Sequence, residues 1–352
     1  MKHDWGEVRD HISSETILSL LVTSACQLRC MMCATSNQSR GSMALHEWMR
    51  VIDEAIDIGV RKLVVTGGEP LIDPKARSIL GRLTSLRSRY GLRIGLTTNG
   101  IALGKQPSLL DETAPSYIDI SIDGTKSVHE FLRGTGSYGL ALKGLDAAQR
   151  LLDSRDIYVC MIMVHGSLSH LPAAIDMLSR RGIRNIYLQP LMPLGRGAEC
   201  GHLVPNAEEI MSLVFDLLSK SFSTPQGGLR IKMWLYPAIA SKLPHDFTLT
   251  AKSRRNYLTG QCLLFRGSAA DIWVDCELKC SLYKGNVLIS PSGLVAGCCV
   301  DLDENAHPLG RLDRFKGKPL RKVRALSTAA NPCGRYDPVM SWKSADEGVW
   351  IV

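Results

Sequence analysis

Short runs rich in β-branched residues alternate with longer segments of helical periodicity between residue 16 and about residue 195. This alternation is typical of βαβ units, which build a parallel sheet. A sheet of this kind brings the carboxyl ends of its strands to one side, where ligands bind. The pattern predicts six strands, at residues 17–22, 62–66, 93–98, 117–122, 157–164 and 185–189.

Helical periodicity fills the gaps between these strands. Between the first two strands, apolar residues recur every three or four positions and Gly59 follows as a stop, so one face of a helix packs on the sheet. Two further helices are predicted at residues 171–181 and 206–221, and Asn206 with Glu209 forms a capping-box pattern at the start of the latter. The apolar positions of the first helix are Leu45, Trp48, Met49, Ile52 and Ile56.

The regular alternation stops near residue 225. Residues 223–260 show no clear period, and a hairpin pattern follows at residues 287–295, turning at Pro291, Ser292 and Gly293. We therefore expect a domain boundary in the irregular stretch. The predicted division is an N-terminal extension at 1–15, a core at 16–225, a linker region at 226–260 and a small C-terminal domain at 261–352.

Composition excludes several classes of protein. With 45% hydrophobic and 22% charged residues among 352, the chain is neither disordered nor fibrous. No apolar stretch approaches the roughly 20 residues of a membrane span, and the charged N-terminus is no signal peptide, so we expect a cytoplasmic protein without a membrane partner. The net charge of +8 is not accompanied by aromatic residues in basic stretches, which argues against a nucleic-acid partner.

Cysteine provides the first chemical signal. Eleven cysteines, an odd number, in a chain without a secretion signal favour reduced thiols that bind metal or act in catalysis. Cys26, Cys30 and Cys33 form the spacing C-x3-C-x2-C directly after the first predicted strand. Three thiolates leave one position open on a four-iron cluster, although half of a zinc site would also explain them.

Polar and glycine-rich motifs follow the next three predicted strands. They are Gly67-Gly68-Glu69-Pro70, Thr98-Asn99-Gly100 and Ser121-Ile122-Asp123-Gly124. Each motif alone could be ordinary turn chemistry. Because strand ends of a parallel sheet converge, their joint occurrence with the cysteines indicates one site.

With these motifs, residues 16 to about 200 resemble the radical SAM superfamily. The resemblance implies an α/β fold with a partial (β/α)6 TIM-like barrel. It implies a [4Fe-4S] cluster on Cys26, Cys30 and Cys33, with S-adenosylmethionine (SAM) chelating the fourth iron. Met32 stands where the family usually has an aromatic residue. The implied SAM-binding residues are Gly67, Gly68, Glu69, Asn99, Ser121, Asp123 and Arg133.

A second group of cysteines, Cys276, Cys280, Cys298 and Cys333, lies near the C-terminus. Cys280, Gly293 and Cys298 fit the C-x9-15-G-x4-C element of the SPASM and twitch domains, which the C-terminal region therefore resembles. The resemblance implies one auxiliary [4Fe-4S] cluster, and zinc is the alternative.

Four further cysteines lie outside both groups. Cys262 and Cys299 are alternatives to Cys276 as a cluster ligand, or hydrogen-atom donors to a substrate radical. Cys160 is expected to be a buried small hydrophobe, and Cys200 has no predicted role.

Two more segments carry weaker signals. The run of residues 191–197, Leu-Met-Pro-Leu-Gly-Arg-Gly, is also found in SPASM relatives and is expected to shape the substrate side of the mouth. Seven cations between residues 311 and 324 form either a solvated helix face or a docking surface for an acidic leader peptide.

The resemblance implies an enzyme that reductively cleaves SAM to a 5′-deoxyadenosyl radical and abstracts a substrate hydrogen atom. We expect an oxidoreductase that cross-links or oxidises a ribosomal precursor peptide, with flavodoxin or ferredoxin as the external electron donor. Only 25 residues precede Cys26, which favours the alternative, a dehydrogenase or epimerase of a sugar or aminoglycoside intermediate. A non-catalytic iron–sulfur redox or sensor protein is a third hypothesis.

Overall fold

The computed structural model describes most of the first 240 residues and shorter segments beyond them. The described residues are 17–35, 41–222, 228–235, 237–240, 242–243, 253–257, 260–266, 270–277, 286–296, 310–312, 342–343 and 349–350.

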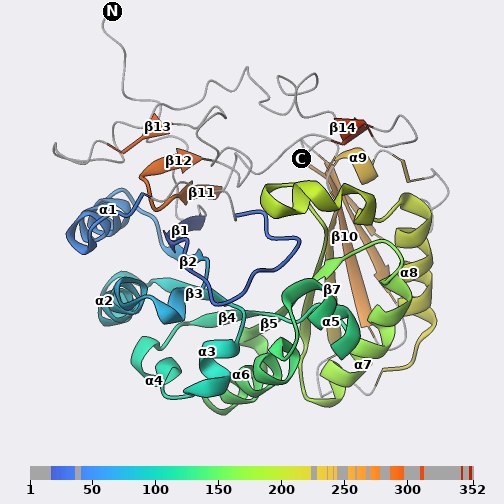
Figure 1. Cartoon of the computed structure of the whole chain (residues 1–352), viewed down its shortest axis with the longest axis horizontal. Coiled ribbons are helices and arrows are strands. Elements are labelled where there is room, and N and C mark those ends of the chain that lie inside the picture. Colours follow the sequence, from blue (N-terminus) through green and yellow to red (C-terminus); the bar gives the residue numbers. More distant parts are fainter. Residues whose placement is uncertain are drawn as a thin grey trace, which may run out of the picture.

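The core of the fold is a curved, largely parallel sheet (Figure 1). Each strand of the six predicted from the sequence pairs in parallel with the next, in chain order. The sheet has two edge strands and does not close into a full barrel, as expected of a partial barrel. These strands are β1 (Ile17–Thr23), β2 (Lys62–Gly67), β3 (Arg93–Thr98), β4 (Tyr117–Ser121), β5 (Ile157–Met163) and β6 (Asn185–Pro190).

The sheet continues beyond these six strands at both ends. Strand β7 (Leu229–Leu235) pairs in parallel with β6, and β10 (Ala270–Glu277) pairs in parallel with β7. The expectation of irregular backbone at residues 223–260 was wrong for β7, because its apolar positions alternate with polar ones and bury every second residue. Strands β9 (Gly260–Arg266) and β8 (Ser253–Tyr257) follow β10 as antiparallel neighbours.

At the other edge of the sheet, the predicted hairpin pairs with the first strand, β1. Strand β11 (Asn286–Ile289) lies parallel to β1, and β12 (Leu294–Ala296) returns antiparallel to it, followed by β13 (Gly310–Arg311). The hairpin is therefore part of the same sheet as β1. A separate pair, β14 (Trp342–Lys343) and β15 (Val349–Trp350), is antiparallel.

Helices cover the convex side of the sheet (Figure 1). Their apolar faces and the outward side chains of the strands form one continuous core, with Trp48 and Ile52 of the first helix fully buried. The helices at 171–181 and 206–221 are confirmed within two residues at each end. The helices are α1 (Leu45–Asp57), α2 (Pro74–Tyr90), α3 (Ile101–Lys105), α4 (Leu109–Thr113), α5 (Lys126–Arg133), α6 (Ser137–Leu151), α7 (Leu171–Arg180), α8 (Ala207–Ser219) and α9 (Pro237–Ala240), with short 3₁₀ turns η2 (Pro70–Ile72), η3 (Ser154–Asp156), η4 (Leu168–His170) and η5 (Gly195–Leu203).

The capping box predicted for α8 forms as the sequence indicates. The Asn206 side chain accepts the backbone N–H of Glu209, and the Glu209 carboxylate accepts the N–H of Asn206. Glu209 also contacts His165 and the N–H of Gly166, which anchors the start of α8 to the loop after β5. Among the helices of the described segments, none combines the length and apolarity that crossing a bilayer requires.

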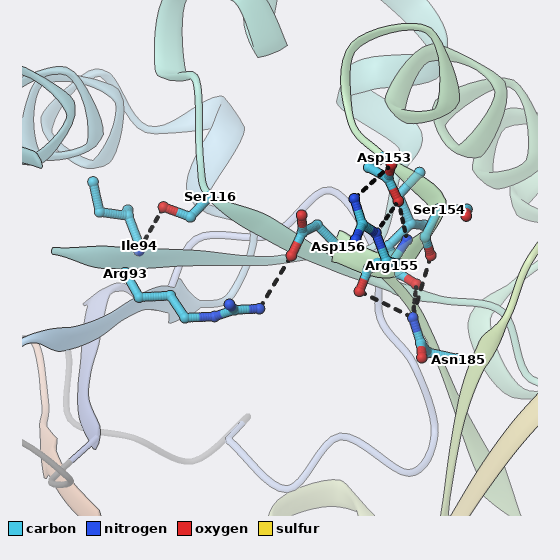
Figure 2. Close-up of polar contacts among 9 residues, drawn as sticks. Arg93, Ile94, Ser116, Asp153, Ser154, Arg155, Asp156 and Asn185 are labelled. Carbon is cyan, nitrogen blue, oxygen red and sulfur yellow. Dashed lines mark hydrogen bonds and ion pairs between the residues drawn. The ribbon is translucent and has the colours of Figure 1, made fainter. Parts of the chain in front are cut away.

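Polar contacts tie together the amino ends of the strands (Figure 2). Asn185, at the start of β6, donates its side-chain amide to the carbonyls of Ser154, Arg155 and Ile157 at 3.1 to 3.2 Å. Arg93, at the start of β3, forms an ion pair of 3.1 Å with Asp156. These contacts lie at the amino ends of the strands, opposite the predicted site. Those of Asn185 join the starts of the adjacent strands β5 and β6, and the ion pair connects β3 with the turn before β5 across β4.

Replacing Asn185 by Leu should lower the free energy of unfolding by about 1–3 kcal/mol, because buried carbonyls lose their donor. Arg155→Ala is the matched control, since it removes only an exposed ion pair with Asp153 and should cause a smaller loss. Urea unfolding of both variants measures the difference. Equal losses would show that the Asn185 contacts add nothing to stability.

Candidate functional site

A cavity of about 370 Å³ opens at the carboxyl ends of the strands. Its wall contains all three cysteines of the first motif together with residues from the predicted strand-end motifs, so the sheet brings the expected site together. The lining residues are Ser24, Cys26, Leu28, Arg29, Cys30, Met32, Cys33, Ala34, Thr35, Thr66, Gly67, Gly68, Thr97, Thr98, Asn99, Ser121, Arg133, Ile162, Gln189, Leu191, Met192 and Arg196.

The cysteine loop, defined as residues 24–35, follows β1 directly and lies on the concave side of the curved sheet (Figure 1). Cys26 is exposed, Cys33 is half-buried and Cys30 is buried. Burial raises the pKa of the Cys30 thiol to about 11, although the Arg133 guanidinium opposes the increase, and burial also raises the pKa of Cys26. Bare thiolates are therefore costly here, and a bound cation would stabilise them.

Backbone contacts attach this loop to the Gly67-Gly68-Glu69 motif. The N–H of Gly68 donates to the Thr23 carbonyl at 2.7 Å, and the N–H of Glu69 donates to the Ala25 carbonyl at 2.8 Å. A β-carbon at Gly68 would lie 2.2 Å from the Ala25 oxygen, and Gly67 combines a similar clash with a φ of +137°. Only glycine allows these two segments to approach so closely.

The Glu69 carboxylate points away from the cavity and is fully buried. It accepts the N–H of Leu71, the hydroxyl of Thr98 and, at 2.8 Å, the N–H of Asn99. Burial raises the pKa of Glu69, and these three hydrogen bonds partly offset that effect. The side chain therefore joins the end of β2 to the end of β3, and it holds the Asn99 turn in place.

Asn99 links this buried network to the cysteine loop. Its side-chain oxygen accepts the amide of Gln27 and the N–H of Ile101, both at 3.0 Å. With the oxygen held, the side-chain nitrogen is directed at the Cys26 sulfur, 3.6 Å away. Asn99 lines the cavity and is only 7% exposed.

Asp123 and Arg133 form a buried ion pair beside the cavity. Arg133 contacts both oxygens of the Asp123 carboxylate through Nε and Nη2, and the N–H of Ile162 donates to the same carboxylate at 2.9 Å. Burial alone would lower the pKa of Arg133, but the Asp123 carboxylate raises it. Arg133 lines the cavity as a permanent cation, whereas Asp123 is fully buried behind it.

His129 contacts the backbone of Asp123, one partner of this ion pair. Its Nδ1 accepts the backbone N–H of Asp123 at 3.1 Å, and its ring packs edge-on against Tyr138. Burial lowers the pKa of His129 to about 4, so the ring is neutral near pH 7.

The structure separates the predicted SAM-binding residues into two groups. Gly67, Gly68, Asn99, Ser121 and Arg133 line the cavity. Glu69 and Asp123 are fully buried and are not among the lining residues, and their side chains contact Asn99 and Arg133, which line the cavity. Met32 also lines the wall, where the family usually has an aromatic residue.

The second group of cysteines falls mostly outside the described residues. Cys280, Cys298, Cys299 and Cys333 lie there, so the auxiliary cluster and the basic segment at 311–324 stay predictions. Cys276 lies on β10, and Cys262 lies on the neighbouring strand β9, where it pairs with Asp275 of β10.

Sequence analysis missed several residues of the wall. Ile162 and Gln189 became apparent as wall residues only from the alternation of β5 and β6. Gln27, inside the cysteine motif, was also without a recognised role, and it donates to the Asn99 side chain. The same alternation places Cys160 on the face of β5 that carries Ile162, not on the buried face expected for a core residue. Burial raises the pKa of the Cys160 thiol well above its usual value.

Comparison with known families agrees with this geometry. Residues 20–178 match the sequence model of the radical SAM superfamily. These residues belong to that superfamily. The match includes the end of β1, the cysteine loop and strands β2 to β5, and it confirms the resemblance to the superfamily derived from the motifs.

Curated relatives of the chain have several named activities. A protein named GTP 3′,8-cyclase 1 from Pseudomonas aeruginosa is 28% identical over 264 residues, covering 71% of this chain and 79% of that protein. The Fe-coproporphyrin III synthase of Methanosarcina barkeri is 26% identical over 183 residues, covering 51% of this chain and 44% of that protein.

Solved structures share the fold at low sequence identity. Native anSMEcpe with bound AdoMet has a TM-score of 0.59 at 13% identity, covering 95% of this chain and 92% of that chain. SuiB of Streptococcus suis bound to S-adenosylmethionine has a TM-score of 0.58 at 14% identity, covering 94% of this chain and 72% of that chain. These similarities support the open α/β barrel.

The superfamily implies a [4Fe-4S] cluster and SAM, and the cavity fits both. Three cysteines and three arginines, Arg29, Arg133 and Arg196, share its wall. Within the described parts of the chain, no three Cys, His, Asp or Glu side chains surround a point suited to one metal ion. A cluster binds each thiolate at a different iron, so its ligands need to face a common space and not a single point.

Glu69→Gln should weaken SAM binding to the reconstituted protein about tenfold, because the N–H of Asn99 loses its acceptor at a cost of about 1–3 kcal/mol. Glu112→Gln, an exposed change on α4, is the control and should leave the affinity unchanged. Equilibrium binding measures both. An affinity equal to that of the wild type in Glu69→Gln would show that the carboxylate does not position the Asn99 turn.

Proposed function

We propose that this chain reductively cleaves SAM to a 5′-deoxyadenosyl radical, which abstracts a hydrogen atom from a bound substrate. The observation that carries this proposal is the shared cavity of Cys26, Cys30, Cys33 and Arg133 at the carboxyl ends of a superfamily barrel. A redox sensor would use the cysteines but has no need of the glycine edge and the Arg133 cation beside them.

Each part of the cavity has a role in this proposal. The three cysteines hold the cluster, which supplies the electron for cleavage when bound. Arg133, fixed by Asp123, pairs with the SAM carboxylate, for which a guanidinium provides two parallel donors. Asn99 and Ser121 offer polar contacts at the ends of β3 and β4, and the close approach at Gly67 and Gly68 shapes the space for the methionine moiety.

A second [4Fe-4S] cluster on Cys276, Cys280, Cys298 and Cys333 belongs to the same proposal. The spacing of Cys280, Gly293 and Cys298 supports it, as does the hairpin of β11 and β12 that forms where this element predicts one. Gly293 has a φ of +83° at the turn, which accounts for glycine at that position of the motif. Such a cluster would serve as an acceptor for the electron left on an oxidised substrate.

For the substrate we propose a ribosomal precursor peptide that is cross-linked or oxidised at a side chain. The SPASM-like cysteine pattern supports this class, and an auxiliary electron acceptor suits an oxidation. GTP is the second candidate, because the relatives at 28% identity include a protein named GTP 3′,8-cyclase 1. Oxidation or epimerisation of a sugar is a further candidate, for which Cys262 or Cys299 would be the hydrogen donor.

The protein in which Cys26, Cys30 and Cys33 are all changed to Ala should produce no 5′-deoxyadenosine under strong reductant. Variants of Cys280 or Cys298 should still cleave SAM, because the open iron belongs to the three-cysteine cluster. Chromatography of the reaction mixture measures the product. If the triple variant cleaved SAM as the wild type does, the first site would be misassigned.

Anaerobic reconstitution should give about eight irons per chain, about four at each site. The triple variant of the first site should retain about four irons, because the second group of ligands is intact. Iron and zinc analysis measures both numbers. A wild type with one zinc and iron for only one cluster would contradict the auxiliary-cluster proposal.

The substrate classes differ in their products. With a peptide encoded by a short open reading frame beside this gene, we expect 5′-deoxyadenosine together with a peptide lighter by two hydrogen atoms. Incubation with GTP is the matched comparison, and a cyclised nucleotide would overturn the peptide proposal. With a sugar substrate in deuterated water, deuterium incorporation that Cys262→Ala or Cys299→Ala abolishes would establish an epimerase instead.

A further inference from the structure

The segment after β6 forms hydrogen bonds with the backbone of the cysteine loop. It consists of Arg196, Gly197 and Cys200, which lie more than 160 residues from the cysteine motif in the sequence. Sequence analysis expected residues 191–197 to shape the substrate side of the mouth. In the structure Leu191, Met192 and Arg196 line the cavity, and Arg196 and Cys200 also form hydrogen bonds with the cysteine loop.

Arg196 contacts two of the three cluster cysteines through their backbone. Its backbone N–H donates to the Cys33 carbonyl at 3.1 Å, and its side-chain Nε donates to the Cys30 carbonyl at 2.9 Å. The side chain therefore extends along the loop from one cysteine towards the other. Arg196 is also one of the residues that line the cavity, together with Cys26, Cys30 and Cys33.

Two neighbouring residues complete this contact. A β-carbon at Gly197 would lie 2.6 Å from the oxygen of Met192, which precedes it in the chain, and 3.3 Å from the Met32 oxygen of the loop, so the backbone leaves little room for a side chain at this position. The Cys200 thiol donates to the Met31 carbonyl at 3.7 Å. From the other side, the N–H of Met31 donates to the Leu132 carbonyl at the end of α5, so the loop is held between two elements.

We propose that Arg196 is a positioning residue for the cluster, which sets the spacing of Cys30 and Cys33 and raises the reduction potential through its charge. This inference rests on the proposed first-site cluster. Reduction adds a negative charge to a cluster, and a fixed cation in the cavity wall stabilises the reduced form more than the oxidised form. The hydrogen bonds and the charge are separable roles, because Lys retains the cation but not the planar geometry.

The test compares Arg196→Gln and Arg196→Lys with the wild type in the reconstituted protein. Redox titration followed by electron paramagnetic resonance gives the potential of the first cluster, recorded in the background of Cys280→Ala and Cys298→Ala. Release of iron to a chelator gives the stability of the site. Arg150→Gln removes the same charge from an exposed position on α6 and is the control.

We expect Arg196→Gln to have a lower reduction potential and to lose iron about tenfold faster, in line with the usual effect of residues that orient metal ligands. Arg196→Lys should recover the potential but not the iron retention. The control should match the wild type in both measurements.

Two results would overturn the inference, and they differ from failure of the proposed function. If the wild type binds a cluster and cleaves SAM while Arg196→Gln has an unchanged potential and unchanged iron release, only the role of Arg196 fails. If the wild type takes up no cluster at the first site, the proposed function fails together with this inference.

Discussion

The close approach of two backbone segments at the ends of β1 and β2 is the contact on which the site depends. Gly67 and Gly68 pack against the carbonyls of Thr23 and Ala25 at distances that exclude any β-carbon. Hydrogen bonds from Gly68 and Glu69 make this contact specific. Because Cys26 follows Ala25 directly, the position of the first cysteine is defined by the sheet and not by the loop alone.

The rest of the cysteine loop depends on contacts with elements distant in sequence. Asn99 reaches the Cys26 sulfur from the end of β3, Leu132 holds Met31 from the end of α5, and Arg196 holds Cys30 and Cys33 from the segment after β6. A loop without regular hydrogen bonds of its own is thereby fixed at several points. Such support is needed by ligands that must keep their spacing through changes of charge.

The amino ends and the carboxyl ends of the strands have different roles. At the amino ends, Asn185 connects β6 with the start of β5, the ion pair of Arg93 with Asp156 connects β3 with the turn before β5, and their expected effect is on stability. At the carboxyl ends, buried carboxylates hold other residues and do not face the cavity. Glu69 positions Asn99 and Asp123 positions Arg133, so the carboxylates hold one amide and one guanidinium side chain that line the cavity.

The sequence by itself determined the six strands, the hairpin, the capping box of α8 and the set of motifs that converge at the strand ends. These features follow from local periodicity, turn residues and cysteine spacing, which a linear pattern records directly. Strand β7 escaped prediction because its short alternating run is surrounded by irregular sequence, and its pairing with β6 is a long-range contact.

Only the tertiary structure decided which site residues line the cavity and which ones hold other residues in place. Glu69 and Asp123 looked like cofactor contacts because they stand inside motifs, but their side chains turn into the protein to satisfy buried donors. Arg196 acquired its role from a contact with residues more than 160 positions away. Side-chain direction and long-range hydrogen bonds depend on where the chain packs, and one-dimensional spacing carries no information about either.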